Sequence, residues 1–170
     1  MKDWIYCPKC STMLIHMGEE RNPYVKCEKC GFVKFNNSLP TVVAIIYDKA
    51  SNLFLFVKRS IAPQLGEWDT VGGFLEPGET AEECLIREAK EEIGCELSDI
   101  QILGTHISIY GETGLMTLGV SFLCQLNGVV NLAEDENSEF RWFPPSEQVT
   151  LAFKDGQEAY SLAKSKLGIS

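Results

Sequence analysis

Acidic side chains are concentrated in one short segment of this chain, where they follow a glycine-rich turn. Glu88, Glu91 and Glu92 occupy positions i, i+3 and i+4, so on a helix they would share one face. Like charges at this spacing destabilise an isolated helix by about 0.2–0.5 kcal/mol per pair. A sequence that concentrates acid in this way usually places a cation there, and carboxylate oxygens suit Mg²⁺ or Mn²⁺. The spacing therefore predicts a site for a hard divalent cation.

Cysteines form a second group with a spacing that suits metal binding. Cys7 and Cys10 make one Cys-x-x-Cys unit and Cys27 and Cys30 make another, with sixteen residues between the two units. This spacing is typical of a four-cysteine zinc site. Four thiolates in a tetrahedron satisfy Zn²⁺ and leave no open coordination position, so we expect a structural zinc ribbon. A segment of about 35 residues has too little core to fold alone, and the metal would stabilise it.

The elements that must position the acidic face can also be predicted from local signals. Thr80 and Glu83 form the pattern of a capping box, which opens a helix. Gly94 is the expected stop of that helix. The buried stripe of the helix is expected at Ala81, Leu85, Ala89 and Ile93.

Strands are predicted on both sides of this helix. Two apolar runs, Thr41–Tyr47 and Leu53–Lys58, enclose a short polar loop and predict a hairpin. Further strand-like segments and a last helix follow, at Ile100–Tyr110, Met116–Leu126, Glu139–Phe143 and, for the helix, Gly156–Leu167. This order fits an α/β sandwich around a mixed sheet. We therefore expect a zinc ribbon over residues 1–38 and a larger domain over residues 39–170.

Composition and charge limit the class of protein. Hydrophobic residues make up 45% of the 170 residues and charged residues 23%, which is typical of a folded globular protein. The formal net charge of −9 disfavours a general nucleic-acid binder. No apolar run approaches the ~20 residues of a membrane span, and the N-terminus has no signal-peptide pattern. Because paired cysteines favour a reducing compartment, we expect a cytoplasmic protein without membrane contact.

The acidic segment closely resembles the Nudix box, G-x5-E-x7-R-E-U-x-E-E-x-G-U, in which U is a small or apolar residue. The matching positions are Gly73, Glu79, Arg87, Glu88, Ala89, Glu91, Glu92, Gly94 and Cys95. The flanks around Arg59, Trp68 and Glu139–Phe143 are also similar to the family, so the resemblance covers roughly residues 40–168. One departure is Val71, where the family usually has proline. The resemblance implies a Nudix-type α/β/α sandwich, and a zinc ribbon in front is a known arrangement.

The resemblance also implies a reaction and roles for particular residues. Nudix hydrolases use Mg²⁺ or Mn²⁺ to cleave the diphosphate bond of a nucleoside diphosphate linked to another moiety. Glu88, Glu91 and Glu92 would hold the ions, with the Gly73 carbonyl as a further ligand, and a glutamate would position or deprotonate the attacking water. Arg87 would pair with Glu79 and lock the loop onto the helix.

A fourth acid outside the box is usual in the family. It would lie in the stretch 134–139, with Glu136 as the first choice and Glu139 as the second. The alternative is a solvated acidic loop without a catalytic role.

Substrate contacts are less well defined by the sequence. Arg59, Trp68 and Phe74 are candidates, and the aromatic rings could either stack on a base or pack in the core. His106 is more consistent with a core or surface residue, with a weak substrate contact as the alternative.

Several substrates and partners remain open at this stage. A small-molecule nucleotide of the ADP-ribose or nucleotide-sugar type is favoured. Family members that act on NADH carry an S-Q-P-W-P-F-P stretch after the box, and residues 105–111 lack it, so NAD(H) becomes an alternative together with nucleoside triphosphates and capped RNA. The ribbon could bind nucleic acid through Lys2, Lys9, Lys26, Lys29 and Lys34. It could instead form a homodimer through Trp4, Ile5, Tyr6, Met13 and Leu14.

Overall fold

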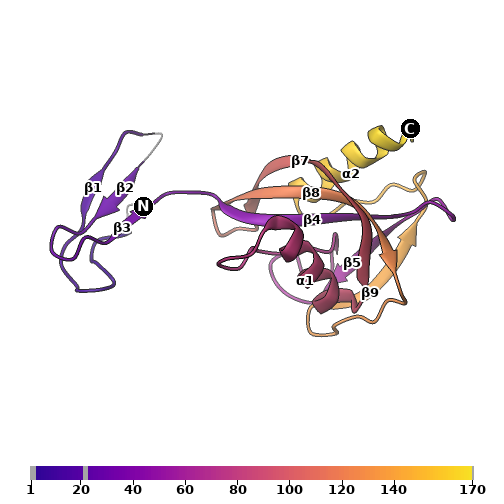
Figure 1. Cartoon of the computed structure of the whole chain (residues 1–170), viewed down its shortest axis with the longest axis horizontal. Helices are drawn as coiled ribbons and strands as arrows, with labels where there is room; N and C mark the ends of the chain where they lie inside the picture. The colour runs from indigo at the N-terminus through magenta and orange to yellow at the C-terminus, as the bar shows by residue number, and fades with distance from the viewer. Residues whose placement is uncertain (1–2, 21–22, 170) are drawn as a thin grey trace. The chain divides into compact units, whose positions relative to one another are not determined.

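A computed structural model describes residues 3–20 and 23–169 of the chain. The chain divides into two compact units, Met1–Ser38 and Leu39–Ser170 (Figure 1). The first unit is a three-stranded antiparallel sheet of β1 (Ile15–Met17), β2 (Tyr24–Lys26) and β3 (Val33–Phe35), in that order.

Two similar turns carry the four cysteines of the first unit. In each turn the residue after the second cysteine has a left-handed backbone, Ser11 with φ of 57° and Gly31 with φ of 73°. Its N–H donates to the carbonyl of the first cysteine, over 2.8 Å to Cys7 and 2.9 Å to Cys27. These turns explain why both Cys-x-x-Cys units aim their sulfurs toward one point.

The small core of this unit changes one part of the dimer hypothesis. Leu14 is 5% exposed and packs with Val25, while Trp4 is half-buried and stacks on Phe32 at 6.2 Å between ring centroids. These two side chains therefore belong to the fold of the unit. Of the apolar residues suggested for a dimer contact, those that are exposed are Ile5, Tyr6 and Met13.

The second unit is built on a six-stranded mixed sheet, which agrees with the predicted fold class. Its strand order is β6-β5-β4-β8-β7, and β9 pairs with β5. β4 and β8 are parallel, whereas the other pairs are antiparallel. The strands are β4 (Leu39–Asp48), β5 (Leu53–Arg59), β6 (Trp68–Asp69), β7 (Glu96–Tyr110), β8 (Leu115–Asn127) and β9 (Asn137–Phe143).

Helices α1 (Ala81–Ile93) and α2 (Lys154–Leu167) cover opposite faces of this sheet. Alternate residues of β4 show the division: Val42 and Ala44 pack in the cluster that contains α1, whereas Val43 and Ile45 pack in the cluster that contains α2. Successive side chains of a strand point to opposite faces, so one buried strand supplies both cores. Within the described residues, neither helix has the length and apolar character that crossing a bilayer demands.

The predicted signals of α1 are confirmed in detail. Thr80 caps the helix and forms the capping box with Glu83, and Gly94 ends it in the left-handed conformation. Ala81 is only partly buried, whereas Cys84 joins the buried side, and so do two of the glutamates, Glu88 and Glu92. Glu88 and Glu92 therefore lie on the buried side of α1 together with the expected apolar residues.

Other boundaries differ from the prediction by a few residues. α2 begins at Lys154, two residues before the expected start, and β7 begins at Glu96, four residues early. A short strand, β6, was not among the predicted strands, and it forms because Trp68 and Asp69 pair with Lys58 and Val57 of β5.

Candidate active site

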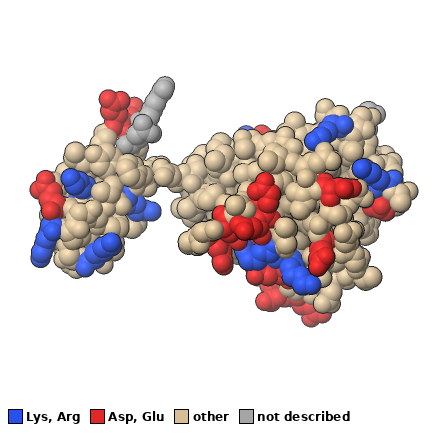
Figure 2. Space-filling view, viewed as in Figure 1, with Lys and Arg blue, Asp and Glu red and all other residues tan. Residues whose placement is uncertain are grey.

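A cavity of about 480 Å³ opens in the second unit beside the glycine turn and α1. Its lining includes Gly73 from the turn, Glu88 and Glu91 from α1, and Glu136 from the loop before β9. Acidic side chains gather on the face where α1 lies, beside a smaller group of basic ones (Figure 2). The segment that carries the Nudix-like pattern therefore faces a space large enough for a small ligand.

The turn before α1 needs both of its glycines. Gly72 has φ of 154°, and a Cβ atom there would collide with the backbone carbonyl of Val42. A Cβ atom at Gly73 would collide with the Glu88 carboxylate. The Gly73 carbonyl accepts a hydrogen bond of 2.9 Å from the Val42 N–H, so a metal at that carbonyl would have to use its second lone pair.

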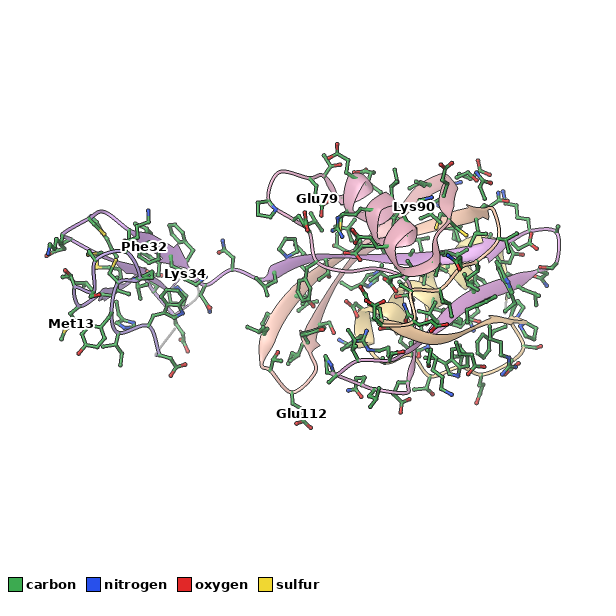
Figure 3. All side chains as sticks on the ribbon, turned by 90° about the horizontal axis from the view of Figure 1, so that it is seen from below. Met13, Phe32, Lys34, Glu79, Lys90 and Glu112 are labelled. Carbon is green, nitrogen blue, oxygen red and sulfur yellow. The ribbon has the colours of Figure 1, made fainter. Side chains whose placement is uncertain are left out.

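Arg87 ties the turn to the helix. Its Nη2 is 2.7 Å from Glu79 Oε1, and its Nη1 is 2.8 Å from Glu88 and 2.9 Å from Glu91. Nη2 also donates to the Phe74 carbonyl over 3.1 Å. The hydrogen bonds that Arg87 donates to Glu79 itself lower the pKa of Glu79 to about 2. The expected pair between Arg87 and Glu79 is present, and Figure 3 shows Glu79 on the loop that leads into α1.

The three glutamates of the acidic face have different surroundings. Glu91 is 54% exposed at its side chain, and Glu88 is buried beside Gly73, where burial raises its pKa. Glu92 does not line the cavity. Its two oxygens accept hydrogen bonds from the Gly72 N–H at 2.8 Å and from Asn137 Nδ2 at 2.7 Å. Burial raises the pKa of Glu92 to about 8.

The two candidates for a fourth acid are separated by the structure. Glu136 is exposed and lines the cavity. Glu139 lies on β9 outside the cavity, where it forms an ion pair of 3.5 Å with Lys58. Asn137, which sequence reasoning missed, is buried and connects β9 to α1 through Glu92.

The four residues suggested for substrate contact also differ in position. Arg59 and Phe74 line the cavity, whereas Trp68 and His106 do not. The Trp68 ring packs edge-on against Phe143 at 5.0 Å between centroids, which is the packing role considered from the sequence. His106 is buried under α2 and contacts Glu158 and Ser121.

Two buried carboxyls in the cavity wall carried no signal that sequence reasoning used. Asp69 pairs with Arg59 at 3.0 Å, and burial raises the pKa of Asp69 to about 6. Asp155 lies in the first turn of α2, where burial also raises its pKa. Asp69 follows Trp68, a flank residue that was recognised, and Asp155 comes one residue before the predicted start of the last helix, so only the tertiary fold reveals their burial.

The four cysteines of the first unit fit one metal ion. Their sulfur atoms all lie within 4.8 Å of one another, with 3.5 Å between Cys7 and Cys30 and 3.5 Å between Cys10 and Cys27. Four sulfurs at about 2.3 Å from a tetrahedral Zn²⁺ would be separated by about 3.8 Å. The remaining cysteines, Cys84, Cys95 and Cys124, are buried in the core beside α1, as expected for inert thiols.

Comparison with known protein families identifies the family of the larger unit. Residues 37–164 match the family model of the NUDIX domain. The chain belongs to the NUDIX family. This assignment confirms the resemblance that the acidic segment suggested.

Individual relatives are more distant. The chain is 29% identical over 138 residues to an NAD-capped RNA hydrolase NudC of Pseudomonas fluorescens, which covers 81% of this chain and 47% of that protein. The chain thus spans about half the length of this curated relative. A NUDIX hydrolase from Nitrosomonas europaea has the same fold, with a TM-score of 0.70 and 23% identity over 96% of this chain and 93% of that one. The NUDIX domain of Shewanella oneidensis NrtR, solved with ADP ribose, has a TM-score of 0.66 and 25% identity over 77% of this chain and 89% of that one.

Proposed function

We propose that this protein is a divalent-metal-dependent pyrophosphohydrolase that cleaves the diphosphate bond of a nucleoside diphosphate linked to another moiety. The observation that carries the proposal is the placement of Glu88, Glu91 and Glu136 around one cavity, next to a turn braced by Arg87. Carboxylate oxygens are the donor set that Mg²⁺ and Mn²⁺ prefer, so the residues present fit such an ion.

The surroundings of each glutamate suggest a different role. Glu88 and Glu91 would hold the ion, and Glu92 would hold the Gly72–Gly73 turn in place through its hydrogen bond to Gly72, or supply a further ligand oxygen. When bound, the ion neutralises the diphosphate and lowers the pKa of a water that attacks phosphorus. Glu136, exposed at the cavity, is placed to orient that water.

The far end of the nucleotide would meet basic and aromatic groups. Arg59 lines the cavity, and its guanidinium faces the Phe153 ring at 5.1 Å. Phe74 lines the same wall and meets Tyr110 edge-on at 5.2 Å. We favour ADP-ribose or a nucleotide sugar as the substrate, and the ADP ribose bound by the Shewanella NUDIX domain supports this choice.

A second candidate is hydrolysis of an NAD(H) or nucleotide cap at the end of RNA. The curated relative is named an NAD-capped RNA hydrolase, and the first unit carries more basic than acidic residues. A test would compare hydrolysis of ADP-ribose, UDP-sugar, NADH, nucleoside triphosphate and NAD-capped RNA, with the mononucleotide product of each identified by chromatography. Preference for ADP-ribose, unchanged by added RNA, would support the first proposal. Activity confined to capped RNA, with steep salt dependence, would replace it with the second.

The first unit would hold Zn²⁺ through Cys7, Cys10, Cys27 and Cys30. Thiolates that bind zinc, together with three further unpaired thiols, fit a reducing compartment such as the cytoplasm. Exposed Ile5, Tyr6 and Met13 leave room for a homodimer contact, which sedimentation would detect.

A further inference from the structure

The cavity is lined on its α2 side by polar side chains that diphosphate hydrolysis does not require. They are Thr41 on β4, Ser108 on β7, Thr117 on β8 and Asp155 on α2. We call these four residues the α2 subsite. Each is less than 9% exposed, yet each lines the cavity.

These groups have unused hydrogen-bonding capacity. The Thr41 hydroxyl is buried without a partner among the described residues. Ser108 and Thr117 are directly opposite each other in the β7–β8 pairing, and both line the cavity. Asp155 uses Oδ1 to accept a bond of 3.0 Å from the Gly156 N–H, which leaves Oδ2 for another donor. Buried polar groups normally have partners, so this cluster points to a bound ligand.

The neighbouring polar residues under α2 behave differently. His106 contacts Ser121 at 2.9 Å and Glu158 at 3.2 Å, and Ser121 also donates to the Gly104 carbonyl. Where α2 covers the sheet, the polar groups therefore satisfy one another. Where the sheet faces the cavity, they do not. The open capacity is thus a property of the cavity and not of polar residues on these strands in general.

Gly119 keeps the space between two of these groups open. A Cβ atom at Gly119 would lie 3.2 Å from Asp155 Oδ2 and 3.4 Å from Thr41 Oγ1. Both oxygens therefore border the small volume that a side chain at this position would fill. A larger residue at this position would therefore crowd the Asp155 and Thr41 oxygens, whereas glycine leaves both uncovered.

A flat apolar wall adjoins the α2 subsite. Tyr110 comes two residues after Ser108, and Phe153 comes two residues before Asp155. The Tyr110 and Phe153 rings stack at 5.5 Å with an angle of 18° between their planes, and both line the cavity. An aromatic wall beside a polar cluster suits a planar heterocycle with a polar edge. A buried carboxylate would repel a phosphate, so the diphosphate belongs at the α1 side.

We propose that the α2 subsite binds the purine base of the substrate, with Asp155 accepting a hydrogen bond from the amino group of adenine or guanine. The inference rests on the proposed nucleotide hydrolysis and names its base class. An ionised carboxylate can only accept hydrogen bonds, so it favours a base edge with an N–H donor. The hydroxyls of Thr41, Ser108 and Thr117 can donate or accept and would bond to the ring nitrogens and carbonyl groups.

The test compares nucleotides that differ by one amino group. Adenosine monophosphate is paired with purine riboside monophosphate, guanosine monophosphate with inosine monophosphate, and uridine monophosphate serves as the pyrimidine. Binding is measured by calorimetry with Mg²⁺ present. We expect at least one amino-bearing purine to bind about tenfold tighter than its deamino partner and than the uridine nucleotide. Equal affinities within about twofold in both pairs would overturn the inference.

Substitution of Asp155 sharpens the comparison. Asp155→Asn keeps one oxygen for the Gly156 N–H but turns an amide donor toward the cavity in place of Oδ2. The preference for the amino-bearing purine should therefore disappear. Retention of the full preference would show that Asp155 does not read the base. Glu112→Gln, an exposed carboxylate at the β7–β8 turn labelled in Figure 3, is the matched control and should leave the preference unchanged.

A second variant tests whether a loss of binding comes from misfolding. Thr117→Val removes one hydroxyl at nearly constant volume and should weaken purine binding several-fold with an unchanged circular dichroism spectrum.

A hydrolysis assay distinguishes failure of the base inference from failure of the proposed function. If diphosphates are hydrolysed without regard to the amino group, the base inference fails alone. If the amino group governs binding but no diphosphate is cleaved, the proposed function fails and the base site remains.

Discussion

The glutamates on the acidic face of α1 differ in exposure and in hydrogen bonding. Glu91 is more than half exposed, and among the described residues its carboxylate bonds to Arg87 alone, whereas Glu92 is buried and bonded at both oxygens. A side chain that is free to move can take up an ion without breaking the fold. Glu91 is therefore the acid whose loss should affect chemistry most and stability least.

We predict that Glu91→Gln lowers kcat by at least about 100-fold because a neutral amide is a poor ligand for Mg²⁺. The free energy of unfolding should change by less than about 1 kcal/mol, since the Arg87 pair is solvent-exposed at Glu91. Steady-state kinetics and urea denaturation measure the two quantities. Glu82→Gln, exposed in the first turn of the same helix, should leave both unchanged. Wild-type kcat in Glu91→Gln would exclude Glu91 as a metal ligand.

Arg87 presents the opposite case, because its guanidinium joins three carboxylates and a carbonyl. A lysine ammonium is a point charge and cannot span these positions. We predict that Arg87→Lys lowers the free energy of unfolding by about 2 kcal/mol and kcat/KM by about tenfold or more. Arg141→Lys is the control, since Arg141 pairs with Glu147 at the surface, and it should cost less than about 1 kcal/mol. Equal costs in the two variants would contradict the bracing role.

The buried Asp69 carboxyl makes stability depend on pH. Burial raises its pKa from 3.8 to about 6, so the folded state holds the proton more tightly than the unfolded chain. Its contribution to stability is complete below about pH 3.8 and is lost as the pH rises through about 6. The loss is on the order of 3 kcal/mol.

Chemical denaturation from pH 4 to pH 7 measures this effect. The free energy of unfolding of the wild type should fall more steeply over this range than that of Asp69→Asn, which has no carboxyl to titrate. The attraction of Arg59 for ionised Asp69 is already part of this pKa, so it adds no separate change of slope. Asp135→Asn, in an exposed loop, should keep the wild-type slope. Identical slopes in wild type and Asp69→Asn would contradict the prediction.

At the scale of elements, the turn before α1 is fixed by close contact with β4. The Ala44 N–H donates to the Val71 carbonyl and the Val42 N–H to the Gly73 carbonyl, so the turn lies along the strand. This contact leaves no room for a side chain at Gly72. Val71, which replaces the usual proline, is 1% exposed and packs in the α1 core. Packing thus supplies the restraint that proline would have given.

We predict that Gly72→Ala lowers the free energy of unfolding by about 3 kcal/mol or more, because the new Cβ meets backbone and the φ of 154° is unfavourable for alanine. Apparent Mg²⁺ affinity should also weaken, since the turn must move away from Val42, which disturbs its hydrogen bond to Glu92. Gly78→Ala is the matched control: its φ is 100°, but a Cβ there meets nothing within 4 Å. It should cost only about 1 kcal/mol. Thermal melts with and without Mg²⁺ measure both effects. An equal loss of melting temperature in Gly72→Ala and Gly78→Ala would show that the close contact between Gly72 and Val42 is unimportant.

Local signals explain what could be read from the sequence. The capping box at Thr80, the stop at Gly94 and the glutamate spacing all lie within one helix and its caps, so α1 and its acidic face could be predicted. The α2 subsite could not. Thr41 comes beside Gly119 only because β4 pairs in parallel with β8, and Asp155 reaches them from the last helix. Asn137 likewise bonds to Glu92 across 45 positions of sequence. Such partners are set by tertiary pairing, which leaves no local pattern.

At the scale of the whole molecule, charge is divided unevenly between the two units. Residues 1–38 contain six basic and four acidic residues, whereas residues 39–170 contain nine basic and twenty acidic ones. An anionic substrate would be repelled by the larger unit unless a cation neutralised the site. Divalent ions are therefore expected to act on substrate binding as well as on chemistry.

A zinc ion held by the four clustered cysteine sulfurs would stabilise the smaller unit, since its described apolar core consists of a few side chains. We predict one zinc per chain by atomic absorption. A zinc-selective chelator should unfold this unit, which the fluorescence of Trp4 reports because its ring stacks on Phe32. Hydrolysis of a small nucleotide with excess Mg²⁺ should remain within about threefold of the untreated rate, because the described residues that line the cavity belong to the larger unit.

Two cysteine variants distinguish this structural role from a catalytic one. Cys27→Ser removes one of the four clustered sulfurs and should abolish zinc binding while hydrolysis of the small nucleotide persists. Cys124→Ser places a hydroxyl in the core of the larger unit, where Cys124 is 2% exposed, and should retain zinc but lower the melting temperature of that unit. If Cys27→Ser instead abolished hydrolysis of the small nucleotide while the larger unit stayed folded, zinc would act in the reaction itself. Persistence of that activity alongside loss of binding to an RNA-linked substrate would show that the ribbon recognises the remote part of the substrate.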